Sequence, residues 1–174
     1  MKFQSLRLIM KPVHRDLASQ VWPILQDENL YTFIPQDPPS LEALEKRYLF
    51  LENTLSPDKT EYWLNWVLFN QDKQEVIGTL QAGVHIENKQ ATIAYMIGIH
   101  AQNKGYATEA VQALIHYLKD QYQITQVKAW IDTRNAASIR LVEKVGMQQV
   151  EFIEKADHFK GSDSDEYVYQ LDIV

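Results

Sequence analysis

The stretch Gln102-Asn103-Lys104-Gly105-Tyr106-Ala107 stands where an apolar, strand-like run passes into helical spacing. The first turn of a helix carries unpaired backbone N–H groups and the positive end of the helix dipole. An anion can therefore bind there if the backbone can be approached closely. Gly105 leaves room for that approach, Lys104 adds a positive charge, and Thr108 adds a hydroxyl. These residue types favour a diphosphate-binding site.

Taken alone, Gly105 is better explained as a plain turn into a helix, beside a solvated Lys104. The chain has no Gly-x-Gly-x-x-Gly and no Gly-Lys-Ser/Thr sequence. A Rossmann dinucleotide site and a Walker-type nucleotide site are therefore excluded. The predicted strands and helices on either side of the loop are therefore needed to infer what it binds.

The hydrophobic pattern before the loop predicts a strand, two helices and then an antiparallel meander of three strands. The first three elements are Leu6–Met10, Arg15–Gln26 and a helix from a Ser40 cap to Asn53. The meander strands are Tyr62–Phe69, Val76–Ile86 and Ala91–Ile99. The chain therefore reaches the phosphate loop from the last strand of a sheet.

After the loop, the pattern predicts a helix, a strand, a second helix and two final strands. These are Ala107–Lys119, Val127–Ile131, Ala136–Lys144 with Gly146 as its stop, Gln149–Ala156 and Glu166–Asp172. The expected fold class is α+β, with a mixed, mostly antiparallel sheet and helices on both faces. At 174 residues the chain is expected to form a single domain, residues 1–174.

Two motifs in this order resemble the GCN5-related N-acetyltransferases (GNAT). Gln102-x-x-Gly105-x-Ala107 is similar to that family's Gln/Arg-x-x-Gly-x-Gly/Ala signature. Asn135-Ala136-Ala137-Ser138, with Lys144-Val145-Gly146-Met147 downstream, is similar to its second signature. Tyr95-Met96-Ile97 and the run from Gly105 to Ala110 resemble its ribosomal-protein-alanine acetylating (RimJ/RimL-like) branch. The resemblance is close from Tyr62 to Met147.

The resemblance implies acetyl-CoA as cosubstrate and a splayed central strand pair, Ala91–Ile99 and Val127–Ile131, that holds its pantetheine arm. Backbone groups of Ile97 and Ile99 would bind that arm, and Asn135 would both contact it and cap a helix. The pyrophosphate would lie against Gln102, Asn103, Lys104, Gly105, Tyr106, Ala107 and Thr108. A primary amine, either a protein N-terminus or a small molecule, would attack the thioester directly, without an acyl-enzyme.

The resemblance assigns the general acid and the general base less directly than it assigns the cofactor-binding residues. Many family members have a Tyr that acts as general acid where this chain has Val142. Ser138 is then the nearest hydroxyl that could donate a proton to the leaving sulfur; the alternative is that Ser138 only packs against the cofactor arm. The resemblance makes Asp157 the candidate base. Three other side chains and an ordered water compete for that role: His85, Glu87 and His100. A non-catalytic acyl-CoA sensor on the same fold is the alternative function.

The amino-acid composition limits the compartment, partners and metal content that we expect. There is no Cys and no long apolar run, which favours a cytoplasmic protein without disulfides or membrane contact. The net charge of -6 argues against a nucleic-acid partner. The five His residues show no paired short spacing, so no catalytic metal is expected. We expect a monomer or homodimer.

Overall fold

The computed structural model describes residues 1–173, which form one mixed sheet of eight strands with four α-helices. The strand order is β1-β2-β3-β4-β5-β6-β8-β7. The strands are β1 (Phe3–Gln4), β2 (Leu8–Pro12), β3 (Glu61–Asn70), β4 (Val76–His85), β5 (Gln90–Ile97), β6 (Gln126–Asp132), β7 (Gln148–Phe159) and β8 (Ser162–Asp172). The helices are α1 (Ala18–Leu25), α2 (Leu41–Leu51), α3 (Tyr106–Tyr122) and α4 (Ala136–Lys144). The predicted α+β class is confirmed.

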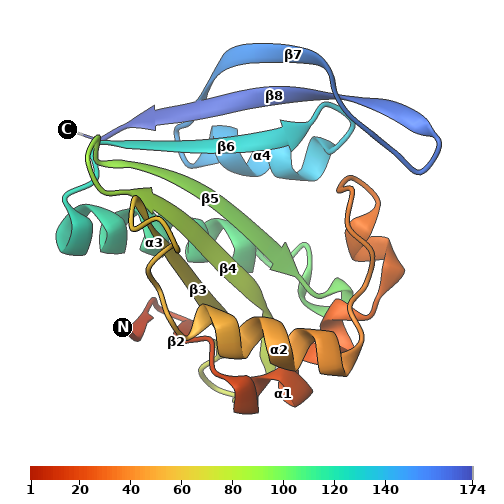
Figure 1. The fold of residues 1–174 in the computed structure, drawn as a ribbon, viewed down its shortest axis with the longest axis vertical. Coiled ribbons are helices and arrows are strands. Elements are labelled where there is room, and N and C mark those ends of the chain that lie inside the picture. Colours follow the sequence, from red (N-terminus) through yellow and green to blue (C-terminus); the bar gives the residue numbers. More distant parts are fainter. Residues whose placement is uncertain (174) are drawn as a thin grey trace.

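The sheet is split between β5 and β6 (Figure 1). This neighbouring pair runs parallel and is hydrogen-bonded only from Gln90–Thr92 to Gln126–Lys128, within the described chain. Beyond these residues the two strands diverge, while β5 stays paired with β4 along its whole length and β6 with β8. The predicted splayed pair is confirmed.

Each face of the sheet is covered by its own helices. Alternate side chains of β5 belong to different cores, because successive residues of a strand point to opposite faces. Ile93 and Ile97 lie in the core beneath α3 and α4, whereas Met96 packs against the core beneath α1 and α2. Figure 1 shows α1 and α2 in front of the β2–β4 part of the sheet and α3 behind it. No helix within residues 1–173 is long and apolar enough to span a membrane.

Most predicted elements occur, with shifted ends near the N-terminus. The first predicted strand lies two residues later, at Leu8–Pro12. The first predicted helix begins as a 3-10 turn, Arg15–Leu17, before α1. The third meander strand ends at Ile97, and Ile99 lies in a 3-10 turn, Ile99–Ala101. A further 3-10 turn, Glu28–Tyr31, follows α1.

The predicted helix boundaries around the second motif and at Ser40 are confirmed. The Ser40 hydroxyl accepts a hydrogen bond from the Ala43 N–H at 3.1 Å and begins α2. The Asn135 side chain accepts from the Ser138 N–H at 3.1 Å and begins α4. Gly146 follows α4 with a φ of +94°, the left-handed conformation that suits a helix stop.

The two final strands are much longer than predicted. The predicted loop at residues 160–164 is reduced to a turn at Lys160 and Gly161, both of which have positive φ, as a tight hairpin requires. Nearly all of β7 is exposed, so its sequence has the polar composition that is typical of loops. The prediction of strands at Gln149–Ala156 and Glu166–Asp172 was therefore too short on both sides of the turn.

Gly78 sets the distance between β4 and β5 at the open end of the split. A Cβ atom at this position would lie 2.1 Å from the carbonyl oxygen of Met96. That oxygen belongs to the backbone, so one of the two strands would have to move. The fit of β4 against β5 beside the split therefore requires glycine.

We expect Gly78→Ala to lower the free energy of unfolding by about 1–3 kcal/mol, the usual cost of overpacking. Gly83→Ala, on the same strand, is the matched control, because its Cβ would meet only the Glu61 side chain, at 3.9 Å. Urea unfolding of both variants measures the difference. Equal stabilities would contradict this account of Gly78.

Candidate active site

The split between β5 and β6 leaves a row of backbone groups on β5 without a strand partner. The Gly98 N–H donates to Ile77 O on the β4 side, at 2.9 Å. Backbone direction alternates along a strand, so the N–H and C=O groups of Tyr95 and Ile97 point the other way, into the split. The split can therefore hold an extended ligand by main-chain hydrogen bonds.

The N-terminus of α3 lies at the end of this slot. Gly105 precedes the helix with a φ of +79°. Within the described chain, the backbone N–H groups of residues 103–108 have no intramolecular acceptor. The Thr108 hydroxyl also has no partner there. Free N–H groups on a left-handed glycine turn form an anion-binding site.

Side chains of the loop mainly hold the loop itself. Gln102 Nε2 donates to Ile97 O at 3.0 Å, and Lys104 Nζ donates to His100 O at 2.8 Å. The Tyr106 hydroxyl accepts from Asn70 Nδ2 at 2.9 Å. Backbone N–H groups are therefore the main donors left for a diphosphate. The assignment of residues 102–108 to it stays a prediction.

Arg7 is part of this loop's surroundings and was missed in the sequence. Its Nε pairs with Glu109 Oε2 at 2.7 Å, and its Nη1 donates to Lys104 O at 3.0 Å. Its guanidinium lies 4.5 Å from the centre of the Tyr106 ring. Burial opposes ionisation of Glu109, but hydrogen bonds from Ser5 and Arg7 outweigh it and lower the pKa of Glu109. The Arg7–Glu109 pair fixes α3 against β2. The two residues are far apart along the chain, so no local sequence pattern indicated that they pair.

Tyr95 and Ser138 meet across the slot, one from β5 and one from α4. Burial raises the pKa of Tyr95, and the Ser138 hydroxyl beside it reduces that rise. The Tyr95 hydroxyl is nevertheless buried without a hydrogen-bond partner of ordinary geometry among residues 1–173. A buried polar atom without a partner is costly, so it marks a place where a ligand atom fits. Val142 is fully buried in the core, and the site has no hydroxyl from that position.

Three carboxylates lie on the opposite side of the sheet from α4. Asp132 on β6 is the register partner of Glu166 on β8, and Asp157 on β7 is the partner of Ser164. Register partners share a face. Ser164 Oγ donates to Asp132 Oδ2 at 2.7 Å, which ties the group together. The predicted base Asp157 is therefore one of a group, and it is exposed.

The three carboxylates differ in ionisation. Burial opposes ionisation of Asp132, but hydrogen bonds from Arg134 and Ser164 outweigh it and lower its pKa. Burial raises the pKa of Glu166, and the negative charges of Asp157 and Asp132 raise it further. A carboxyl with a raised pKa is a better proton acceptor from an amine. Glu166 is therefore a candidate base that the sequence analysis did not single out; only the alternation along a correctly bounded β8 could have placed it.

The competing histidines lie elsewhere. His85 pairs with Gln90 at the closed end of the sheet and approaches Glu61 at 3.5 Å. Glu87 follows it in the exposed turn to β5. His100 flanks the phosphate loop and lies 3.5 Å from Glu75. The structure groups none of them with Ser138.

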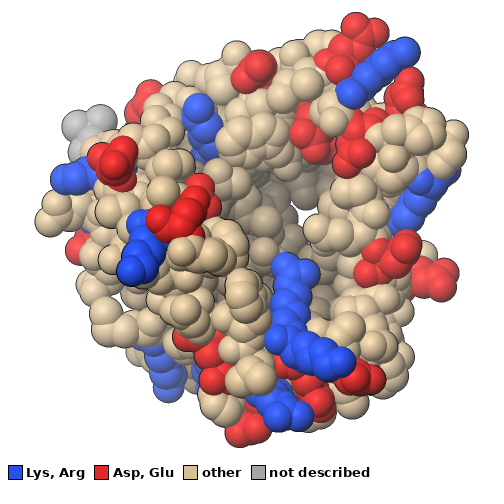
Figure 2. All heavy atoms as spheres, in the orientation of Figure 1, with Lys and Arg blue, Asp and Glu red and all other residues tan. Residues whose placement is uncertain are grey.

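A pocket of about 160 Å³ opens on the α1–α2 side of β5, and a second one of about 660 Å³ shares Arg47, Asn65 and Gln81 with its lining. Met96 lines the first pocket, and its neighbour Ile97 borders the slot. The β7–β8 hairpin reaches this side, where Lys160 Nζ donates to Tyr31 O. Figure 2 shows this face hollowed between the β6–β8 half and the α1–α2 half, with Lys and Arg side chains on its α2 rim. A second substrate can thus approach the slot from this side.

These features fit an extended thioester-bearing ligand with a diphosphate at one end. A model of the GNAT acetyltransferase domain matches residues 7–148. The chain belongs to the GNAT acetyltransferase family. As a GNAT enzyme it depends on acetyl-CoA, the predicted cosubstrate.

Relatives agree with this assignment. The chain is 31% identical over 102 residues to the uncharacterized N-acetyltransferase p20 of Bacillus licheniformis, which covers 58% of this chain and 57% of p20. A coenzyme A complex of the ribosomal L7/L12 α-N-protein acetyltransferase RimL superimposes with a TM-score of 0.86 at 19% identity, over 99% of this chain and 98% of that one. Spermidine N-acetyltransferase from Vibrio cholerae, in complex with CoA and spermine, superimposes with a TM-score of 0.82 at 16% sequence identity, over 95% of each chain. At these identities the solved structures show the shared fold.

The diphosphate site predicts the effect of Gly105→Glu. The new side chain and its negative charge would occupy the anion position, so we expect acetyl-CoA affinity to fall by at least about 100-fold, measured by calorimetry. Gly161→Glu is the matched control, because Gly161 also has a positive φ, +77°, and nothing within 4 Å of its Cβ. Unchanged affinity in a folded Gly105 variant would refute the site.

Proposed function

We propose that this GNAT enzyme transfers the acetyl group of acetyl-CoA directly to a primary amine, held on the α1–α2 side of β5. The single observation that carries the proposal is the arrangement of the slot. It has free N–H donors at the α3 end, a hydroxyl pair on one side, and a raised-pKa carboxyl with an open pocket on the other. Acetyl-CoA supplies the activated acyl carbon.

In the proposed reaction the chain positions groups and moves protons. Glu166, or Asp157 beside it, takes a proton from the ammonium form of the acceptor. The amine nitrogen then forms a bond to the acetyl carbon as the carbon–sulfur bond breaks. An N–H of β5 near Ile97 stabilises the carbonyl oxygen during attack. Ser138 gives a proton to the departing sulfur, and the second proton that the nitrogen loses as the amide forms restores the Ser138 hydroxyl. Asn135 is free to bind the arm through its Nδ2 while its Oδ1 caps α4.

The acceptor is either the N-terminus of a protein or a small-molecule amine. RimL is named for a ribosomal protein substrate, and the spermidine enzyme for a polyamine. The shared fold thus supports both acceptor classes. The test is thiol release from acetyl-CoA with a panel of amines and peptides. Steady release with any acceptor supports the enzyme; acetyl-CoA binding without release across the panel would instead favour a sensor.

If Ser138 is the acid, Ser138→Ala should lower kcat by about 100-fold, because positioned acids contribute that much or more. The KM for acetyl-CoA should change little. Ser138→Thr keeps a hydroxyl and should retain most of the rate. A kcat within a few-fold of the parent in the Ala variant would remove Ser138 from this role.

If Glu166 is the base, the rate depends on its carboxylate form. Because burial and two neighbouring charges raise its pKa, kcat/KM should fall as pH decreases through a value above that of an ordinary Glu. Glu166→Gln should lower kcat/KM by about 100-fold and abolish this acid limb. Glu154→Gln, exposed on β7, is the control. A persisting acid limb in the Gln variant would assign the base elsewhere.

A further inference from the structure

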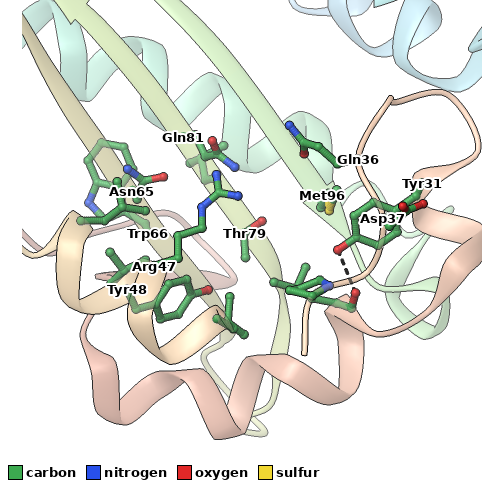
Figure 3. Close-up of a pocket in the computed structure, with 16 residues that line it drawn as sticks. Tyr31, Gln36, Asp37, Arg47, Tyr48, Asn65, Trp66, Thr79, Gln81 and Met96 are labelled. Carbon is green, nitrogen blue, oxygen red and sulfur yellow. Dashed lines mark hydrogen bonds between the residues drawn. The ribbon is translucent and has the colours of Figure 1, made fainter. Parts of the chain in front are cut away.

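The first pocket contains polar side chains that have no partner among residues 1–173. Arg47 on α2 makes no ion pair or hydrogen bond with any described residue, and the side chains of Thr79 and Gln81 on β4 make none either. Thr79 is only 7% exposed. In Figure 3 the Arg47 head group reaches from α2 toward Gln81 and Thr79. The pocket thus gathers a guanidinium, an amide and a hydroxyl, all able to donate.

The sheet supports this grouping. Asn65 is the register partner of Gln81, and Thr79 is the partner of Met96. Their side chains therefore form a polar row on the α1–α2 face of the sheet. Tyr48, 4% exposed, lines the same pocket, and its hydroxyl is buried without a partner within residues 1–173. Buried polar groups normally have partners, so the Tyr48 hydroxyl indicates a ligand with acceptor oxygens, and the exposed Arg47 adds a charged donor to the same pocket.

The charges in the pocket indicate which ligand. Arg47 lies near the Gln81 end, whereas Asp37, on the segment before α2, lies across Met96 from it in Figure 3. The two are not ion-paired in the described structure. A planar guanidinium with an unpaired fork of donors is suited to a carboxylate. The Met96 end lies next to Ile97 and the slot, where an amine has to be placed.

We propose that the acceptor is a small amine that also carries a carboxylate, such as a free amino acid. Its carboxylate binds Arg47, with Gln81 and Thr79 as further donors, and its amine lies at the Met96 and Asp37 end beside the thioester. This inference rests on the proposed function, because it names the acceptor of the same site. Arg47, Thr79 and Gln81 are specificity residues, separate from the proton-transfer groups.

The test compares matched acceptors that differ only in the carboxylate. Common α-amino acids, β-alanine and γ-aminobutyrate are each assayed against their carboxamides by thiol release. We expect the parent enzyme to prefer at least one carboxylate over its carboxamide by about 10-fold or more in kcat/KM. Arg47→Met should raise the KM for that carboxylate by about 10- to 100-fold, the loss of a charged hydrogen bond, and leave the carboxamide unchanged.

Lys46→Met is the control, because Lys46 is the preceding residue of α2 and its Nζ pairs in solvent with Glu42 at 2.7 Å. It should keep the parent's preference. Equal use of carboxylate and carboxamide by the parent, an equal loss for both in Arg47→Met, or turnover of peptides alone would each overturn the inference while the enzyme remains active.

A binding measurement separates this inference from the proposed function. The same acceptor pairs are titrated by calorimetry into the parent and into Arg47→Met, each saturated with CoA. Binding of a carboxylate that is lost in Arg47→Met supports the pocket even if no acceptor releases thiol, in which case only the proposed function fails. No difference between the acceptor pairs in the parent overturns the inference.

Discussion

The hydrogen bonding between β5 and β6 ends after Thr92 and Lys128, and the rest of the molecule is arranged around that end. An interrupted parallel pair leaves main-chain donors and acceptors exposed, which a folded protein normally avoids. Here the two strands are held apart by separate partners, β4 on one side and β8 on the other. A ligand in the slot can form hydrogen bonds with these unpaired backbone groups, which offsets the free-energy cost of leaving them unpaired.

The groups around the slot are divided between the two faces of the sheet. Ser138 and Tyr95 lie on the α4 side, while Glu166 and the pocket under α2 lie on the other. The proposed proton donor and the proposed proton acceptor therefore lie on opposite faces of the sheet. This division prevents a direct hydrogen bond between Ser138 and Glu166. It also gives the acceptor a route that does not cross the cofactor slot.

The sequence predicted the features that depend on local patterns. The turn at Gly105, the caps at Ser40 and Asn135, and the meander all follow from residues close together in the chain. Features that depend on distant residues were missed. Arg7 reaches Glu109 across 102 residues of sequence, and Arg47 lines a pocket with Gln81 because α2 packs against β3, the neighbour of β4. The β7–β8 hairpin was misjudged because a strand exposed along most of its length has the composition of a loop.

The tight turn at Lys160 and Gly161 has a consequence for how this enzyme tolerates change. The face on which Glu166 lies is set by its pairing with β6 and by Tyr167 and Tyr169, which pack in the core, whereas the side chains between the turn and Glu166 depend on the residue count along β8. Between the turn and Glu166 the β7–β8 register shifts once, between Ile153 and Asp157, where the extra residues lie on β7. Insertions of even length could lengthen this arm and keep the carboxyl in place. A one-residue insertion would be absorbed on the turn side of Glu166, because the core packing of Tyr167 and Tyr169 holds the carboxyl on its face, and Ser164 would turn away from Asp132.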